Sequence, residues 1–467
     1  MIALDNVDKL VISFKFPPSD DVSGIVVGKR IINEGSPVDV LHNEVDESEF
    51  LKFDVIDKYI NERFIVSVDG KRDSHEQIRE FIRQGFDILD KNDVYHEIYS
   101  RSWYMANHFL AMEYKFRHPE VFWTAEFSDP VSRKMDGTIR ITKASMVENE
   151  KYIDKLNSRI AQVNPDFKPL DVPNVSYFIA EYMTFMFADK IIFTNPNQRE
   201  IMLEIYDDEF RKFVIDKSVI IPHPTLSDDF YYLEEHKMEL DENDVNIAYF
   251  GNIYYISRHF EALFHAFDSL NHKHKDKLKF HLFLNNDYYF KILINDLDIK
   301  ESIILRKPLR YFEFLNATTQ FDVLLINDTI TKDFYTINPY LPSKLSDYKG
   351  SHIDIWAIYE NGSVLSTQDV KYKSSMTDYT QSTQVLVDIL KDNGYGDESY
   401  TLNDSVYENR ITQLNLTMKK EVNAKNKYRR QIKKLKKENK RLKEENEKIL
   451  SSNSWKITKP LRKLRNK

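Results

Sequence analysis

Asn338-Pro-Tyr-Leu-Pro-Ser-Lys-Leu-Ser-Asp-Tyr348, continued by Lys-Gly-Ser351, is the stretch around which the rest of this chain is organised. It follows the apolar run Phe321-Asp-Val-Leu-Leu-Ile-Asn327, which is typical of a buried parallel strand. The two prolines exclude a helix across the first half of the stretch. Ser343 can cap a helix that begins directly after it. A strand, a loop and a helix therefore follow one another here.

Two side chains of this predicted helix suggest a ligand. Lys344 and Asp347 are three residues apart, so they share a face near the helix N-terminus. A lysine and helix N-terminal amides suit phosphate groups, and a carboxylate suits ribose hydroxyls, so the pattern fits a nucleotide sugar. The alternative is a surface helix with an ordinary ion pair.

The same alternation of apolar runs and helical patterns covers most of the chain and predicts an open α/β sheet in each half. An acidic stretch at 233–244 reads as the linker between the halves, and residues 133–175 read as a connection with few apolar patterns. Ligands of such sheets bind at the carboxyl ends of the strands, and a cleft between two domains is the default place for one. The expected strands are 9–16, 38–41, 64–68, 93–99, 121–127, 189–194 and 218–224, then 246–253, 279–284, 302–305, 321–326 and 353–358.

Three residues of the first half stand where those carboxyl ends would be. Gly24 lies in a loop where a helix starts and permits a close approach of backbone to a ligand. Arg101 and Asp129 each follow a predicted strand and would point into the crevice. The alternatives are an ordinary turn, a surface arginine and an Asp-Pro turn.

The second half offers a matching set. Gly251 and Asn252 end its first predicted strand, and Arg258 lies near the start of the helix that follows. The strand-loop-helix repeat places these residues on the same sheet edge as Lys344 and Asp347.

Length and charge divide the chain into parts. Its 467 residues are enough for two domains and an appendage. The net charge of −8 combines a basic end, with 18 Lys/Arg and 4 Asp/Glu in residues 425–467, and a remainder with 48 Lys/Arg and 70 Asp/Glu. We predict an acceptor-side domain at 1–224, a linker at 225–244, a nucleotide-sugar domain at 245–398, a helical connection at 399–424 and a basic coiled coil and tail at 425–467.

The basic end shows two patterns. Apolar or Asn residues recur at heptad spacing from Tyr428 to Ile449, and Asn at two a positions favours a parallel dimer. The alternative is a solvated single helix. The last residues mix Trp455 with six Lys/Arg, which predicts reversible binding to an anionic membrane surface. No nucleic-acid-binding motif accompanies the charge, so no nucleic-acid partner is expected.

Several classes of protein are disfavoured. The chain has no cysteine, which excludes a disulfide framework and cysteine-based sites and fits a reducing compartment. Its N-terminus lacks the pattern of a signal peptide, and no apolar run approaches the roughly 20 residues of a membrane span. We expect a cytoplasmic protein that is peripheral on the inner face of the cell membrane.

The motifs taken in order resemble a GT-B glycosyltransferase of the bacterial retaining, GT4-like group. The resemblance spans about residues 9–360, and the terminal Ser-Trp-Lys-Ile-Thr-Lys-Pro-Leu-Arg pattern looks like tails of bacterial surface-polysaccharide transferases. The matching motifs are Phe16-Pro-Pro with Val22-Ser-Gly24, Phe127-Ser-Asp-Pro130, Ala188-Asp-Lys-Ile-Ile-Phe-Thr194, Val219-Ile-Ile-Pro222, Tyr249-Phe-Gly-Asn252 with Arg258, and 338–348.

The resemblance implies two Rossmann-like domains facing each other across a cleft, and transfer of a sugar, with a UDP-sugar as the expected donor, to a cell-surface glycan or polyol-phosphate acceptor. Arg258 and Lys344 would stabilise the leaving diphosphate without a metal or cofactor. Arg101 and Asp129 would lie on the acceptor side, where Asp129 would orient the acceptor. The implied donor-binding residues are Gly24, Gly251, Asn252, Arg258, Ser343, Lys344 and Asp347.

Two other hypotheses stay open. Pro339 stands where the family has the first glutamate of its Glu-x7-Glu motif, which favours a non-catalytic partner that scaffolds an active transferase. Asp296-Leu-Asp298 is a DxD sequence and would suit a metal-dependent transferase of a different fold.

Overall fold

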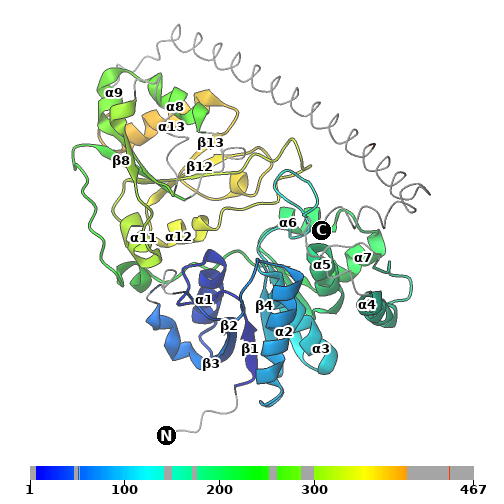
Figure 1. The fold of residues 1–467 in the computed structure, drawn as a ribbon. Coiled ribbons are helices and arrows are strands. Elements are labelled where there is room, and N and C mark those ends of the chain that lie inside the picture. Colours follow the sequence, from blue (N-terminus) through cyan, green and yellow to red (C-terminus); the bar gives the residue numbers. More distant parts are fainter. Residues whose placement is uncertain are drawn as a thin grey trace, which may run out of the picture. The chain divides into compact units, whose positions relative to one another are not determined.

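The computed structural model describes residues 7–46, 51, 53–140, 150–170, 176–251, 260–285 and 299–396, together with Arg441. Residues 1–398 form one compact unit and residues 399–467 a second. The first unit contains two parallel sheets, and we call the parts built around them the first and the second lobe (Figure 1). The predicted coiled coil and tail lie outside the described residues.

The first lobe has a seven-stranded sheet in the order β3-β2-β1-β4-β5-β6-β7, and every neighbouring pair is parallel. Its strands are β1 (Lys9–Ile12), β2 (Val38–Asn43), β3 (Ile60–Val66), β4 (Glu97–Arg101), β5 (Phe122–Phe127), β6 (Lys190–Phe193) and β7 (Ser218–Ile220). Its helices are α1 (Val22–Glu34), α2 (His75–Leu89), α3 (Met105–Arg117), α4 (Glu150–Val163), α5 (Ser176–Phe187), α6 (Pro196–Leu203) and α7 (Asp208–Asp216), with a 3₁₀ helix at η2 (Asp54–Tyr59).

The second lobe has a six-stranded sheet in the order β10-β9-β8-β11-β12-β13, again parallel throughout. Its strands are β8 (Val245–Phe250), β9 (Leu278–Phe283), β10 (Ile303–Arg306), β11 (Val323–Asn327), β12 (Asp354–Tyr359) and β13 (Tyr372–Ser375). Its helices are α8 (Glu261–Asp268), α9 (His272–Lys277), α11 (Tyr311–Thr318), α12 (Lys344–Gly350) and α13 (Tyr379–Asp392), and the 3₁₀ helices η4 (Asp228–Tyr232), η5 (Lys300–Ser302) and η6 (Leu365–Thr367) complete the described elements.

The prediction of two α/β sheets is confirmed, and three details differ. The connection expected at 133–175 contains α4, whose Ile153, Leu156 and Ile160 are buried at helical spacing. The strand expected at 218–224 ends at Ile220, before its prolines. β13 and α13 were not predicted, and β13 is short and polar, so it lacks the apolar run by which the other strands were identified.

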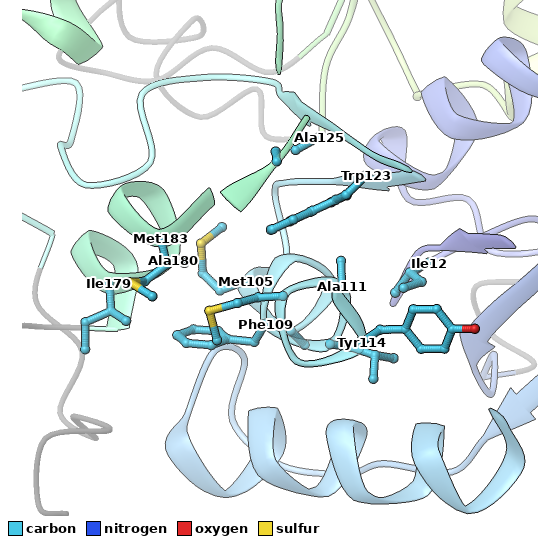
Figure 2. Packing of buried hydrophobic residues seen from close by; sticks show 14 of the residues in the cluster. Ile12, Met105, Phe109, Ala111, Tyr114, Trp123, Ala125, Ile179, Ala180 and Met183 are labelled. Atoms are coloured by element: carbon cyan, nitrogen blue, oxygen red, sulfur yellow. The ribbon is translucent and has the colours of Figure 1, made fainter. Parts of the chain in front are cut away.

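The sheet of the first lobe is covered on both faces. On one face, strand residues pack against α2, α3 and α5 in a large apolar cluster around Trp123 and Phe109 (Figure 2). On the other face, residues of α1 and η2 form a cluster that also includes Phe312 and Leu315 of α11 in the second lobe. The rings of Phe53 and Phe312 meet edge-on with centroids 4.8 Å apart, so the two lobes share part of their apolar core.

The carboxyl edges of the two sheets face each other. Lys134, after β5, accepts a hydrogen bond at its carbonyl from the Tyr335 hydroxyl, after β11, at 2.5 Å. Asn195, after β6, donates to the Pro339 carbonyl at 3.1 Å. Asn197 donates to carbonyls that follow β11 and β12 at 3.0 and 3.2 Å. The strand ends where ligands of parallel sheets bind are therefore brought together from both lobes.

Two buried carboxylates of the first lobe carry opposite pKa shifts. Burial raises the pKa of Glu181, in α5, to about 7, although the Ser132 amide and hydroxyl donate to it. Burial acts in the same direction on Glu126, at the end of β5, but Arg30 and Arg101 outweigh it and lower the pKa of Glu126 to about 2. Ionised Glu126 of β5 is thus linked to α1 and β4 through its ion pairs with Arg30 and Arg101.

We predict that Glu181→Gln changes the stability of the protein in a pH-dependent way. A raised native pKa contributes stability that is complete below the unfolded value near 4.5 and is lost as the pH rises to about 7. The free energy of unfolding of the variant, relative to wild type, should therefore rise by about 3 kcal/mol between pH 4 and pH 8, as measured by urea denaturation.

Glu126→Gln is the matched control. Its depressed native pKa contributes stability above the unfolded value, which is lost only as the pH falls toward about 2. We expect this variant to be destabilised by a nearly constant amount from pH 5 to pH 8. A Glu181→Gln difference that is equally flat over this range would contradict the assignment.

Candidate functional site

The candidate site lies at the carboxyl edge of the second sheet, between β8 and β11. The chain runs from β8 outward through β9 and β10, and it then returns to place β11, β12 and β13 on the other side of β8. The strand order therefore reverses between β8 and β11, and such a switch point is where open parallel sheets bind their ligands. The carboxyl ends that meet there are Phe250 of β8 and Asn327 of β11.

Gly251 and Lys344 come together at this edge, as the sequence predicted. Gly251 has a φ of +133°, and a Cβ built on it would collide with the Lys344 ammonium. Lys344 Nζ donates to the Phe250 carbonyl and lies 4.1 Å from the centroid of the Tyr249 ring. The first residue of α12 thus reaches over the sheet edge and places a positive charge at the end of β8.

Ser343 does not play the capping role expected of it. It stands before α12, but its backbone is already helical and its side chain makes no capping hydrogen bond. Two prolines precede Ser343, and the chain enters this seven-residue helix through backbone turns instead of a side-chain cap. Its role in donor binding stays a prediction.

Asn327 is a candidate site residue that the sequence analysis missed. It ends β11 at 1% exposure, and its amide oxygen and amide nitrogen are both buried without a hydrogen-bond partner among the residues that the structure describes. The register that pairs Val323 with Ile247 and Leu324 with Ala248 places Asn327 opposite Gly251 when it is continued. A buried amide with neither group satisfied is costly, and a ligand at the switch point would satisfy it. The available signal was a polar residue at the end of an apolar run.

Asp347 lies one turn after Lys344 in α12, but its partner comes from the other lobe. Its Oδ1 accepts from Lys29 Nζ of α1 at 2.8 Å and from the Tyr311 hydroxyl of α11 at 2.9 Å. Its main-chain carbonyl accepts from the Tyr231 hydroxyl at 2.5 Å. Lys344 and Asp347 thus have different partners: Lys344 contacts the end of β8, whereas Asp347 forms an ion pair with the other lobe.

The first-lobe residues are placed as follows. Gly24 lies in the first turn of α1 and not in a loop, and a Cβ there would stand 2.6 Å from the Lys15 carbonyl oxygen. Its missing side chain therefore makes room for the chain's own backbone, which the sequence could not show. A place beside donor phosphates stays a prediction for Gly24.

Arg101 ends β4 and is buried, with Nε 3.0 Å from Glu126 Oε1 and Nη1 donating to the Ser23 hydroxyl at 2.8 Å. Asp129 is half-buried after β5. Burial raises the pKa of Asp129, while the Arg101 and Arg140 charges act in the opposite direction. Arg101 thus links β4 to β5 and α1 at this edge, and Asp129 lies after β5 at the same edge. Contacts with an acceptor remain predictions for both residues.

Asn252, Arg258, Asp296 and Asp298 lie outside the described residues, so the predicted Arg258–Lys344 pair is not seen. Within the described part of the chain, no group of three or more His, Asp or Glu side chains is arranged to hold a metal ion. The described helices also include none with the length and apolar character that a membrane crossing requires.

Comparison with known proteins identifies the architecture. No protein-family model matches the chain, and no curated protein matches its sequence. Among solved structures, sucrose-phosphate synthase from Thermosynechococcus elongatus matches with a TM-score of 0.51 and 12% identity, over 83% of this chain and 90% of that one. Anabaena HepE in complex with UDP matches with a TM-score of 0.50 and 9% identity, over 83% and 91%.

The chain has a GT-B fold. At these identities the likeness concerns the fold, and the expectation of two Rossmann-like domains is confirmed. The GT-B arrangement also explains why the two carboxyl edges face each other and why α11 and α12 contact α1.

We predict that Asn327→Leu, which keeps the branching and the number of side-chain heavy atoms, stabilises this GT-B chain because it removes the buried amide. Eliminating two unsatisfied buried groups should raise the free energy of unfolding by about 1–3 kcal/mol, measured by urea denaturation.

The control is Asn316→Leu in α11. Asn316 is also buried, but its amide donates to the Tyr231 carbonyl at 2.9 Å and accepts from the His236 amide at 2.8 Å. This variant should be destabilised. Equal destabilisation by both substitutions would show that Asn327 is satisfied within the folded protein.

Proposed function

We propose that this chain is a glycosyltransferase that takes its sugar from a nucleotide-diphosphate donor bound at the β8–β11 switch point. The observation that carries the proposal is the meeting of Lys344, Gly251 and the unsatisfied Asn327 amide at that edge. The fold supports it, because the similar structures include a sucrose-phosphate synthase and a HepE protein in complex with UDP.

The proposed reaction breaks the bond between the sugar C1 and the diphosphate and forms a bond from C1 to an acceptor oxygen. Negative charge grows on the diphosphate as it leaves. The Lys344 ammonium at the end of β8 would stabilise that charge. Arg258 would add a second positive group, as the sequence resemblance implies. The acceptor proton would pass to the departing phosphate, and Asp129 would orient the acceptor.

The finer assignments rest on the sequence. A UDP-sugar donor, a retaining GT4-like mechanism and a surface glycan or polyol-phosphate acceptor are parts of the proposal that follow from the motifs in 9–360. Self-association through 428–449 and attachment of 425–467 to an anionic membrane are likewise proposed from heptad spacing and charge.

A non-catalytic partner subunit is the second candidate function, and one observation favours it. Pro339 replaces the glutamate that the family motif would have, and its carbonyl is used in a contact with Asn195 of the first lobe. The neighbouring Asn338 carbonyl is used in the same way by Asn197. This loop would then serve to join the lobes and not to hold a sugar.

Lys344→Met tests the proposed donor site. Because a hydrogen bond to a charged group contributes about 1.5–3 kcal/mol, we expect the Kd for UDP to rise roughly 10- to 100-fold, measured by isothermal titration calorimetry. Turnover of a UDP-sugar should fall by at least as much, since the lysine would act on charge that grows in the transition state.

Lys349→Met is the matched control, because Lys349 lies on the same helix and is exposed. It should leave binding and turnover unchanged. Wild-type binding of UDP without turnover of UDP-, GDP- or dTDP-sugars would favour the non-catalytic partner. Unchanged UDP binding by Lys344→Met would remove the donor site from this edge.

A further inference from the structure

Lys29 makes an unusual contact for a lysine in an amphipathic helix. It lies in α1 of the first lobe at 1% exposure, and its ammonium crosses to α12 of the second lobe. There it donates to Asp347 Oδ1 at 2.8 Å and to the Ser346 hydroxyl at 3.0 Å. Lysine is almost never fully buried without a partner, so the ion pair with Asp347 is what allows Lys29 to be buried between the lobes.

The contact fixes one oxygen of the Asp347 carboxylate. Lys29 and the Tyr311 hydroxyl both donate to Oδ1, the second at 2.9 Å. Among the described residues, none donates a hydrogen bond to Oδ2, and the Asp347 side chain keeps 13% of its surface exposed. The carboxylate is thus oriented by one donor from each lobe, and its second oxygen can still accept from a ligand.

The surroundings keep this orientation rigid. The Tyr231 hydroxyl, from η4, donates to the main-chain carbonyl of Asp347 at 2.5 Å. The apolar cluster that joins α1 to α11 packs beside it and includes Tyr231. A group held from both sides in this way is ordered before a ligand arrives, which lowers the entropy lost on binding.

We propose that Lys29 is a positioning residue for nucleotide ribose recognition. From the opposite lobe, it holds the Asp347 carboxylate so that Oδ2 accepts a hydrogen bond from a ribose hydroxyl. Discrimination between ribonucleotides and deoxyribonucleotides then depends on contact between the lobes as well as on the second lobe itself. This inference rests on the proposed function, and it adds a residue that no sequence motif indicated.

A purely structural bridge is the competing explanation, and discrimination separates the two. If Lys29 only holds the lobes together, its loss weakens binding of every nucleotide by the same factor. If Lys29 orients Asp347, its loss weakens binding of the ribonucleotide more than that of the analogue without the hydroxyl, because a site built around a hydroxyl penalises its absence. The Kd of the deoxy analogue divided by the Kd of the ribonucleotide therefore reports only the orientation of the Asp347 carboxylate.

The experiment measures Kd values of UDP, 2′-deoxy-UDP and 3′-deoxy-UDP for the full chain by isothermal titration calorimetry. For wild type, we expect at least one deoxy analogue to bind about tenfold or more weakly than UDP. In Lys29→Met this ratio should fall to about threefold or less. Asp347→Asn should show the same loss, and Lys9→Met, which removes an exposed ion pair with Glu34 near the end of α1, should keep the wild-type ratio.

The possible failures are distinguishable. No UDP binding by wild type would overturn the proposed function and this inference with it. UDP binding with a wild-type ratio near one would leave the proposed function standing and overturn the ribose role of Asp347 and Lys29. A tenfold ratio that persists in Lys29→Met would overturn the positioning role alone.

Tyr311→Phe provides a second test if Lys29→Met does not fold. It removes the other donor to Asp347 Oδ1 and keeps the ring, which is half-buried beside Phe53. We expect the ratio of Kd values to fall two- to fivefold. An unchanged ratio in this variant would contradict the claim that donors on Oδ1 orient the carboxylate.

Discussion

The buried ammonium of Lys29 forms an ion pair with Asp347 where the two lobes meet, and this pair ties the arrangement of one lobe to that of the other. An ammonium removed from water needs a carboxylate close by, and the available one belongs to the other lobe. Removing one partner of such a buried pair typically costs about 3–5 kcal/mol, so the contact fixes how the lobes meet more strongly than an exposed ion pair could. The shared cluster of Phe53, Phe312 and Tyr231 adds apolar burial to the same contact.

This contact holds the carboxyl edges of the two sheets facing one another, but the edges differ in how their polar groups are used. In the first lobe, Arg101, Arg30 and Glu126 satisfy one another beneath the edge. In the second lobe, the Asn327 amide is unsatisfied at the end of β11. A folded chain tolerates such a group where function needs it. The second lobe therefore has the stronger indication of a ligand. The first lobe contributes its buried ion pairs and the Lys29 ammonium.

Much of the fold could be predicted from the sequence, because buried parallel strands are apolar runs that stand out against their loops. The same reasoning found Gly251 and Lys344, since a glycine and a lysine after such runs fall on one sheet edge. It missed α4, whose few apolar residues are diluted by charged ones, and it misjudged Ser343, whose capping geometry depends on the turns before it.

Two site features could not be found from the sequence for physical reasons. Lys29 looks like a solvent-facing residue of an amphipathic helix, and its partner is separated from it by 318 positions in the chain. Asn327 looks like the polar end of a strand, and only the three-dimensional structure shows that neither of its amide groups has a partner in the described part of the chain. Neither an ion pair between residues far apart in the chain nor an unsatisfied buried amide leaves a pattern in the local sequence.

A crystal structure of the full chain grown with UDP would show whether a nucleotide diphosphate binds at the carboxyl ends of β8 and β11. We expect density for the diphosphate within hydrogen-bonding reach of Lys344 Nζ and the Asn327 amide, with the ribose beside Asp347. Density for UDP at another part of the chain, with this edge unchanged, would contradict it.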